Sequence, residues 1–472
     1  MLDFKPIKFE DAEVLKKYYI NCNYGASEYS VGTQLMWGIK HKTLWAEVHG
    51  CLICKDIFNR KTFFDYPVPL SGEDVSIDKA LDEIDAWCLE NEIIPSFFSV
   101  PKEGYAKLFA RYKYYKVRSI RSWSDYLYDV HDLAGFGGRK YSGQRNHINK
   151  FIKLVPDYEF KVLTGDDKEL VEKFLEEYSK VFTKYDNPFA RDELYYAKTL
   201  LSELSKDWCR CGGIYSPSLG KLLSFTLTEK CGKTLIIHIE KGLYEYNGIY
   251  PTTVSECAKK FGSDCEIINR EEDANDKGLR TSKLQYLPKE IGSKFAIEVE
   301  TELSVNVDEI IPTINTQRLT LDAFTDEDAA EYLELCSDTE LNKYWGYDDL
   351  GHIDSNDKAR ALIRVTKDDF HKKIAINFAV RLNGKLIGEA VLHNFNSKGS
   401  AEAGCRIKGE FAGNGYGQEA FKAICEWGLY TAMLDTVNAK CFKQNEASYK
   451  MLKDSMVEIG SDDTYIYFVR KV

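Results

Sequence analysis

Two stretches of this chain, 222–299 and 375–470, repeat one order of predicted elements, and this repeat constrains the fold most strongly. Each stretch has antiparallel strands, a loop with glycine, a helix, a strand that ends near an asparagine, a short helix and final strands. Asn269 and Asn445 occupy matching places. An order of elements that recurs in one chain indicates a duplicated structural unit. We therefore predict an α/β (α+β) fold in which a mixed unit occurs more than once.

Length and composition limit the class of protein. The 472 residues correspond to about three domains of roughly 150 residues, and the 44% hydrophobic content suffices for a core in each. A net charge of -11 excludes a protein that works by coating nucleic acid, although a local basic patch stays compatible with it. No apolar run reaches the ~18 residues of a membrane helix, and no apolar signal segment opens the chain. We expect a cytoplasmic protein without membrane insertion.

The cysteines are too scattered for a disulfide framework. There are 13 of them, an odd number, in a long chain without an export signal, which favours reduced thiols. The close pairs, Cys51 with Cys54 and Cys209 with Cys211, lie far apart in the sequence and lack the spacing of a zinc finger. We therefore expect buried free thiols and no metal.

The segment Gly413–Gly417, with the sequence GNGYG, lies between a predicted strand and a predicted helix. Glycines allow backbone N–H groups to point at one place, and the helix N-terminus adds a partial positive charge, which suits a phosphate or a pyrophosphate. A simple tight turn is the alternative. No Gly-Lys-Ser/Thr follows, as a nucleotide P-loop requires. The hairpin signal Asn383-Gly384 makes the preceding strands antiparallel, unlike a dinucleotide-binding fold.

Five motifs follow one another between residues 312 and 472. They are TQRLTL from Thr316, TDEDA from Thr325, AEAG from Ala401, GNGYGQEA from Gly413 and NEAS from Asn445. Together they resemble the GNAT superfamily of N-acetyltransferases, and within it the ribosomal-protein alanine N-acetyltransferases. The resemblance implies an acyltransferase with acetyl-CoA as co-substrate, which transfers acetyl directly to a primary amine on a protein N-terminus or a small molecule.

The same resemblance places the CoA site along the strand 400–407, which would splay from its neighbour, and on the loop. The residues implied are Gly404, Cys405, Arg406, Ile407, Gly413, Asn414, Gly415, Tyr416, Gly417 and Asn445. Two positions depart from the family pattern. Ala412 stands where Gln or Arg usually begins the loop, and Ser455-Met456 replaces the usual Gly-Phe after the last helix.

Amine attack on a thioester needs a base for the ammonium and an acid for the leaving thiolate. The position of the tyrosine acid found in many superfamily members is Leu452. The branch resembled here implies Ser448 as the acid, and a simple first-turn hydroxyl is the alternative. Glu402 is our candidate base, with Glu389 as second choice and a solvated strand carboxylate as the alternative. Asn445 either bonds the pantetheine or caps a helix, and both roles are compatible.

The first 300 residues carry a second resemblance, through segments 126–151 and 268–288 and through Ser27-Glu-Tyr-Ser30 and Trp37. These look like the soluble C-terminal part of bacterial phosphatidylglycerol lysyltransferases, which is similar to a tandem of two acetyltransferase-like folds. We therefore expect three acetyltransferase-like units, each a mostly antiparallel sheet flanked by helices. The expected boundaries are 1–125, 126–300, a linker or last strand at 301–311, and 312–472.

Two charged clusters mark a candidate cleft in this N-terminal module. Cations between residues 139 and 153 could receive CoA phosphates, the end of an aminoacyl-tRNA or lipid headgroups, or form a solvated helix face. Residues 269–283 mix both signs, as in a substrate cleft or a structural ion-pair network. His238 is a candidate base or, alternatively, a core histidine. The cleft residues we select are Lys140, Arg145, Asn269, Arg270, Arg280 and Lys283.

Two other functions remain open at this point. The N-terminal module could transfer an aminoacyl group from charged tRNA, with tRNA or another anionic ligand as its partner. The chain could also be a non-catalytic protein that senses CoA or another ligand, which Ala412 permits.

Overall fold

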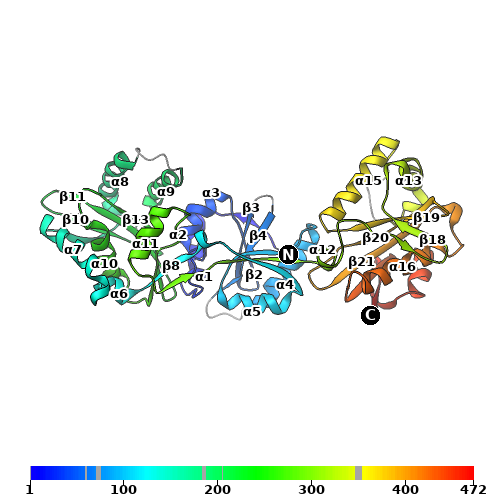
Figure 1. The fold of residues 1–472 in the computed structure, drawn as a ribbon, viewed down its shortest axis with the longest axis horizontal. Coiled ribbons are helices and arrows are strands. Elements are labelled where there is room, and N and C mark those ends of the chain that lie inside the picture. The colour runs from blue at the N-terminus through cyan, green and yellow to red at the C-terminus, as the bar shows by residue number, and fades with distance from the viewer. Residues whose placement is uncertain (1, 59–60, 71–75, 183–187, 205, 346–352) are drawn as a thin grey trace. The chain divides into compact units, whose positions relative to one another are not determined.

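The computed structural model describes residues 2–58, 61–70, 76–182, 188–204, 206–345 and 353–472 (Figure 1). Three mixed sheets are each flanked by helices, which confirms the predicted fold class. The chain divides into two compact units: Met1–Ile84, Ser96–Lys107 and Val117–Ile297 form unit 1, and Asp85–Pro95, Leu108–Lys116 and Glu298–Val472 form unit 2. Among the described helices, none has the length and apolar character needed to cross a membrane.

The first sheet has the strand order β1-β2-β3-β4-β6-β16-β7, with β5 on β3. Its strands are β1 (Lys5–Pro6), β2 (Leu44–Val48), β3 (Cys51–Phe58), β4 (Lys61–Asp65), β5 (Val68–Pro69), β6 (Ser96–Val100), β7 (Tyr114–Ser119) and β16 (Phe295–Glu300). The helices are α1 (Ala12–Tyr19), α2 (Val31–Thr33), α3 (Ile39–His41), α4 (Ile77–Glu90) and α5 (Lys102–Arg111), with a π-helical turn at Gln34–Gly38.

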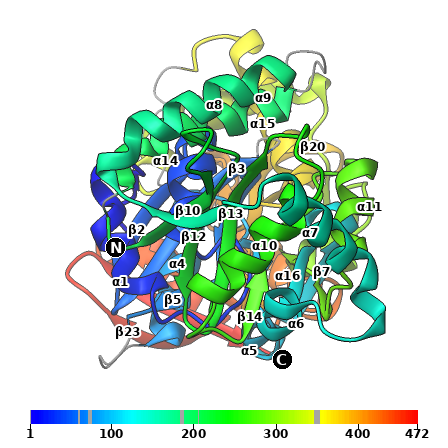
Figure 2. The same cartoon turned by 90° about the vertical axis from the view of Figure 1, so that its left-hand side faces the viewer.

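The second sheet has the order β11-β10-β12-β13-β14-β8-β15, with β9 on β10. Its strands are β8 (Asp125–Asp129), β9 (Glu159–Leu163), β10 (Cys209–Ser216), β11 (Lys221–Leu222), β12 (Ser224–Cys231), β13 (Thr234–Gly242), β14 (Ile267–Asn269) and β15 (Glu290–Gly292). The helices are α6 (Val130–Gly135), α7 (Ser142–Leu154), α8 (Lys168–Phe182), α9 (Pro188–Thr199), α10 (Ile249–Phe261) and α11 (Lys277–Gln285). Figure 2 shows α10 lying across β12 and β13.

The third sheet has the order β17-β18-β19-β20-β21-β22-β24-β23. Its strands are β17 (Ile314–Asn315), β18 (Leu319–Asp322), β19 (Ile376–Leu382), β20 (Lys385–His393), β21 (Ser400–Ile407), β22 (Thr436–Phe442), β23 (Val457–Ser461) and β24 (Tyr465–Lys471). The helices are α12 (Glu302–Asn306), α13 (Ala329–Ser337), α14 (Thr339–Asn342), α15 (Asn356–His371), α16 (Tyr416–Tyr430) and α17 (Glu446–Lys453).

Alternation along β19 places a core on each face of the third sheet. Phe378 and Val380 belong to the cluster that includes α16, whereas Ala379 belongs to the cluster with α13 and α15. Figure 1 shows these helices on opposite faces of the sheet. Because strand side chains alternate between faces, this one strand is buried on both sides. Its turn to β20 uses Asn383 and Gly384, both with positive φ, as the hairpin signal predicts.

The repeated order of elements differs between the two stretches at its end. In the C-terminal stretch, β23 and β24 close the third sheet, whereas in the earlier stretch β16 leaves the second sheet and joins the first. Strands β9 and β10 are also present, although the sequence did not predict them. Gly212 and Gly213 interrupt the alternating side-chain pattern by which β10 could have been predicted. Position 213 requires glycine, because a Cβ there would lie 2.0 Å from the carbonyl oxygen of Ser224 on β12.

The closeness of β10 and β12 predicts that Gly213→Ala destabilises unit 1. The added methyl group has no room against a backbone carbonyl, so we expect a loss of about 1–3 kcal/mol in the free energy of unfolding. Urea unfolding of the full chain measures it. Gly137→Ala is the matched control, because a Cβ there meets nothing within 4 Å. Equal stability of the two variants would contradict the packing described.

Candidate functional site

Strands β21 and β22 form the parallel pair of the third sheet, and their pairing ends early. The pairs run from Ser400–Thr436 to Glu402–Asn438. Both strands continue beyond this point, and across residues 403–407 and 439–442, all of which are described, no further pair follows. We call the place where a parallel ladder ends a fork, and number each fork by its sheet, so this one is the third fork. The free edge of β21 is five residues long, or roughly 16 Å at the usual strand rise.

The glycine loop lies at the far end of that free edge and leads into α16. Gly413 and Gly415 have φ of +76° and +80°, a conformation that favours glycine. Gly415 is the N-cap of α16, so the first N–H groups of the helix lack intrahelical partners. A Cβ at Gly417 would lie 3.5 Å from Ile407 and 3.9 Å from Met451. The loop, the end of β21 and helix α17 therefore meet here.

Glu402 lies at the point where the third fork opens. Its side chain is 22% exposed, and its Oε1 lies 3.2 Å from Lys440 Nζ. Asn394 Nδ2 donates to Glu402 Oε2 at 3.4 Å. His393 of β20 is paired directly with Glu402, so the two side chains share a face. Burial lowers the pKa of His393, which leaves a neutral imidazole beside this carboxylate near pH 7.

Arg406 and Glu389 form a buried ion pair on the same face of the sheet. Arg406 donates from Nη2 and Nε to Glu389 Oε2 at 2.5 and 3.0 Å, and Asn377 Nδ2 donates to Glu389 Oε1 at 2.8 Å. The Trp345 ring lies 4.7 Å from the guanidinium and 3.5 Å from a Cβ built on Gly404. Both carboxylate oxygens of Glu389, the second choice for the base, are thus hydrogen-bonded within the protein. Trp345 lies beside the site, and sequence reasoning missed it.

Asn445 is the N-cap of α17, and its side chain accepts the backbone N–H of Ser448 at 3.1 Å. Asn445 is therefore a helix cap, one of the two roles considered for it. Ser448 is half-buried in the first turn, and Leu452 is buried one turn later. The short cap fixes where α17 starts, next to the end of β22.

The first sheet contains a comparable first fork, but a tyrosine crosses it. The parallel pairs of β4 and β6 end at Asp65–Phe98. Beyond this pair, the hydroxyl of Tyr29 bonds both strands. It accepts from the backbone N–H of Tyr66 at 3.2 Å and donates to the carbonyl of Ser99 at 3.0 Å. One buried phenol thus replaces the next step of the ladder.

The second fork, between β13 and β14, is crossed by ion pairs. The parallel pairs end at Ile236–Asn269. His238 Nδ1 then lies 2.9 Å from Glu271 Oε1, and Arg270 Nη2 donates to Glu240 Oε1 at 2.8 Å. Although burial favours the neutral imidazole, hydrogen bonds to Glu229 and Glu271 raise the pKa of His238 to about 9. His238 is buried, as expected for a core histidine, and it is also part of an ionic network.

The predicted N-terminal cleft residues separate into two places. Four of them, Asn269, Arg270, Arg280 and Lys283, lie around the end of β14. Lys283 Nζ donates to the carbonyls of Arg270 and Glu271 at 2.6 and 3.2 Å, and Arg280 donates to Asp273. Lys140 and Arg145 instead bind groups of their own segment, Asp132 and the Gly138 carbonyl.

Sequence reasoning missed the buried cation Lys294 in this module. Its Nζ lies 2.8 Å from both Glu28 and Asp125. Asn269 Nδ2 also donates to Asp125 at 2.8 Å, and Ser27 N–H donates to it at 2.9 Å. The Ser27–Ser30 motif was the signal that could have found this cluster.

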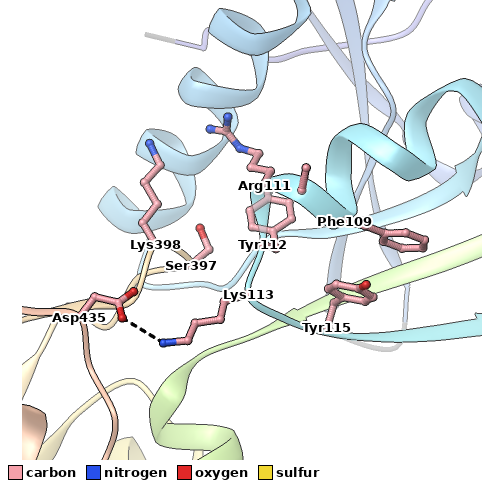
Figure 3. Close-up of a pocket in the computed structure, with 9 residues that line it drawn as sticks. Phe109, Arg111, Tyr112, Lys113, Tyr115, Ser397, Lys398 and Asp435 are labelled. Carbon is pink, nitrogen blue, oxygen red and sulfur yellow. Dashed lines mark hydrogen bonds and ion pairs between the residues drawn. The ribbon is translucent and has the colours of Figure 1, made fainter.

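A separate pocket in unit 2 is lined by Phe109–Lys113, Tyr115, Ser397, Lys398 and Asp435 (Figure 3). Two of its cations are already paired, Lys113 with Asp435 at 3.1 Å and Arg111 with Asp85 at 2.5 Å. Lys398 and Asp435 precede β21 and β22, whereas the third fork opens toward the ends of these strands. The pocket is therefore not part of the site at the fork.

Two family models match separate parts of the chain. The family model "Phosphatidylglycerol lysyltransferase, C-terminal" matches residues 21–298, and "Acetyltransferase (GNAT) domain" matches residues 318–455. The uncharacterized protein MYCGA3080 of Mycoplasmoides gallisepticum is 24% identical over 182 residues, 38% of this chain and 57% of that protein. The uncharacterized N-acetyltransferase YnaD of Bacillus subtilis is 27% identical over 140 residues, 30% of this chain and 79% of that protein.

A solved structure resembles about two thirds of the chain. It is a conserved protein of unknown function from Bacteroides thetaiotaomicron, with a TM-score of 0.57 and 24% identity, covering 64% of this chain and 100% of its own. This likeness shows that the fold of the larger part of the chain occurs in another protein.

The second fork predicts a loss of stability at alkaline pH. Because the pKa of His238 is about 9 in the folded chain and near 6.5 when unfolded, its contribution is complete below about pH 6.5 and is lost as the pH rises through 9. We expect the free energy of unfolding of the wild type to fall by a few kcal/mol relative to His238→Gln between pH 6.5 and 9.5. Urea titrations at each pH measure it, and parallel curves would contradict the ionic bridge.

Proposed function

The chain belongs to the phosphatidylglycerol lysyltransferase C-terminal family and carries a GNAT domain after that region, and from this premise we propose an acetyl-CoA-dependent N-acetyltransferase. Residues 312–472 form the catalytic domain, of the ribosomal-protein alanine N-acetyltransferase type. The acceptor is a primary amine on a protein N-terminus or a small molecule. The third fork, with the glycine loop at its far end, carries the proposal.

The free edge of β21 and the loop suit the two parts of the co-substrate. Backbone N–H and C=O groups of Gly404–Ile407 have no partner strand on the β22 side, so they can bind the amides of the pantetheine arm. The N–H groups of Gly413–Gly417 and of the first turn of α16 suit its diphosphate. Asn445 fixes the start of α17 beside this edge.

The reaction requires two proton transfers. The amine nitrogen attacks the thioester carbonyl, a C–N bond forms, and the C–S bond breaks. Glu402, held by Lys440 and Asn394 where the fork opens, takes the amine proton. Ser448, in the first turn of α17, gives a proton to the leaving thiolate. Glu402 belongs to β21 and Ser448 to the helix that follows β22, so the two roles use side chains of the two elements beside the fork.

The other two forks support a single co-substrate site. Tyr29 crosses the first fork, and the His238–Glu271 and Arg270–Glu240 pairs cross the second. These bonds belong to buried or partly buried groups, and the loss of such bonds is costly. We therefore assign the first two sheets a role other than thioester binding.

A second function is favoured by an observation in the N-terminal module. Among the described residues, Glu28 Oε2 is buried without a hydrogen-bond partner, beside Lys294 and Asp125, and burial raises the pKa of Glu28 to about 7. A strongly perturbed buried carboxyl group in a charged cluster is typical of functional sites. Aminoacyl transfer from charged tRNA, which the family of this region suggests, would use this cluster and the neighbouring Arg270, Arg280 and Lys283.

Calorimetric titration of the full chain with acetyl-CoA tests the site. We expect one equivalent bound, and a loss of affinity of at least tenfold in Gly415→Asp, because a carboxylate would face the diphosphate and glycine supplies the left-handed backbone. Gly384→Asp is the matched control, with φ of +84° in a hairpin turn distant in sequence from the loop. Two or more equivalents, or no binding, would contradict the proposal.

Release of the CoA thiol over a panel of amines tests the proton transfers. Glu402→Gln should lower turnover by about 10²–10⁴-fold and Ser448→Ala also, while the affinity for acetyl-CoA is retained. Turnover that is unchanged in one variant would remove that residue from its role. Binding without turnover of any amine would favour the sensing alternative, and absence of CoA binding with retention of aminoacyl-tRNA would favour aminoacyl transfer.

A further inference from the structure

Arg318, which stands just before β18, lies against the glycine loop although 95 residues of chain separate it from Asn414. Its Nη1 donates to the carbonyl of Asn414 at 2.9 Å, and its Nε donates to Glu419 Oε2 at 2.7 Å. The guanidinium lies 4.5 Å from the ring centre of Tyr416. Three residues of the loop and of the first turn of α16 thus hold this one side chain.

The remaining amino group of Arg318 points toward the N-cap of α16. A Cβ built on Gly415 would lie 3.4 Å from Nη2. The side chain is 42% exposed, and Nη2 makes no hydrogen bond with any described residue. A positive charge therefore lies beside the free N–H groups of the helix, and both N–H groups of Nη2 are available as donors.

The loop lacks a cation of its own. Ala412 occupies the position where the superfamily usually has Gln or Arg, and no residue of Gly413–Gly417 is basic. The side-chain amide of Asn414 donates to the carbonyls of Phe411 and Ala412. A diphosphate carries more negative charge than backbone dipoles alone balance, and a guanidinium can bind phosphate oxygens through two parallel N–H groups.

We propose that Arg318 is a binding residue of the CoA diphosphate and supplies the charge that position 412 lacks. This inference rests on the proposed function of the domain. Glu419 positions the guanidinium before the ligand arrives, which reduces the rotamer entropy that binding must overcome. The Thr316 hydroxyl and the Arg318 backbone N–H also donate to Glu419 Oε1, at 2.6 and 2.9 Å, so this carboxylate is itself fixed.

A purely structural role for Arg318 makes a different prediction. If the ion pair with Glu419 matters because it joins the segment before β18 to α16, then removal of either partner should have the same effect. If Arg318 binds phosphate, Glu419→Gln keeps the cation and leaves most of the affinity intact. The two variants therefore separate the two roles.

The test is calorimetric titration of the full chain with CoA, and with pantetheine, which lacks the diphosphate. We expect Arg318→Ala to weaken CoA binding 10- to 100-fold at low salt and to leave pantetheine binding unchanged, by loss of one charge-assisted contact of about 1.4–2.7 kcal/mol. Arg318→Lys keeps the charge without the planar guanidinium, so its CoA affinity should lie between those of the wild type and Arg318→Ala. Glu419→Gln should stay within about threefold of the wild type.

Three outcomes decide the matter. Affinity of Arg318→Ala within twofold of the wild type would overturn the proposal while leaving the CoA site in place. Equal weakening in Glu419→Gln and Arg318→Ala would overturn it in favour of the structural role. A wild type that binds no CoA would refute the proposed function itself, and this result is visible before any variant is made.

Discussion

A parallel ladder that stops leaves backbone N–H and C=O groups in need of partners, and this need organises all three sheets of the chain. An unpaired buried backbone group is costly, so the groups beyond the last pair must bond to something. In the first sheet the hydroxyl of Tyr29 serves both edges. In the second, side-chain ion pairs of His238 and Arg270 span the opening. Lys283 Nζ donates there to the backbone carbonyls of Arg270 and Glu271. In the third sheet the described part of β21 beyond its last parallel pair has no partner on the β22 side, and the proposed acetyl transfer depends on this free edge.

The first two forks are joined by one short segment of unit 1. Residues 25–32 supply Tyr29 to the first fork, and the carbonyl of Gly25 accepts from Asn269 at the end of the second. The N–H groups of Val31 and Gly32 donate to Glu229, which also bonds His238. The same stretch carries Glu28 to Lys294. A motif without an evident role in the sequence is thus the connection between two sheets.

Local signals of the sequence predicted local structure well. The turn Asn383-Gly384, the strand 400–407 and the glycine bend before α16 follow from residues that are adjacent in the chain. Helix α16 begins at Tyr416, so the last two residues of the predicted loop 413–417 belong to its first turn. Arg318, Tyr29 and Lys294 were not recognised, because each acts on groups that are dozens to hundreds of residues away. Strand β10 was missed for a related reason, since its glycines serve the approach of β12 and weaken the strand pattern.

Hydrogen exchange of the full chain with and without CoA tests the central claim most directly. The account predicts slower exchange for the backbone amides of 403–407 and 413–417 when CoA is bound, with no change at 64–68, 97–100, 236–240 and 269–271, which border the other two forks. Protection at either of the latter forks, or none along β21 and its loop, would contradict it.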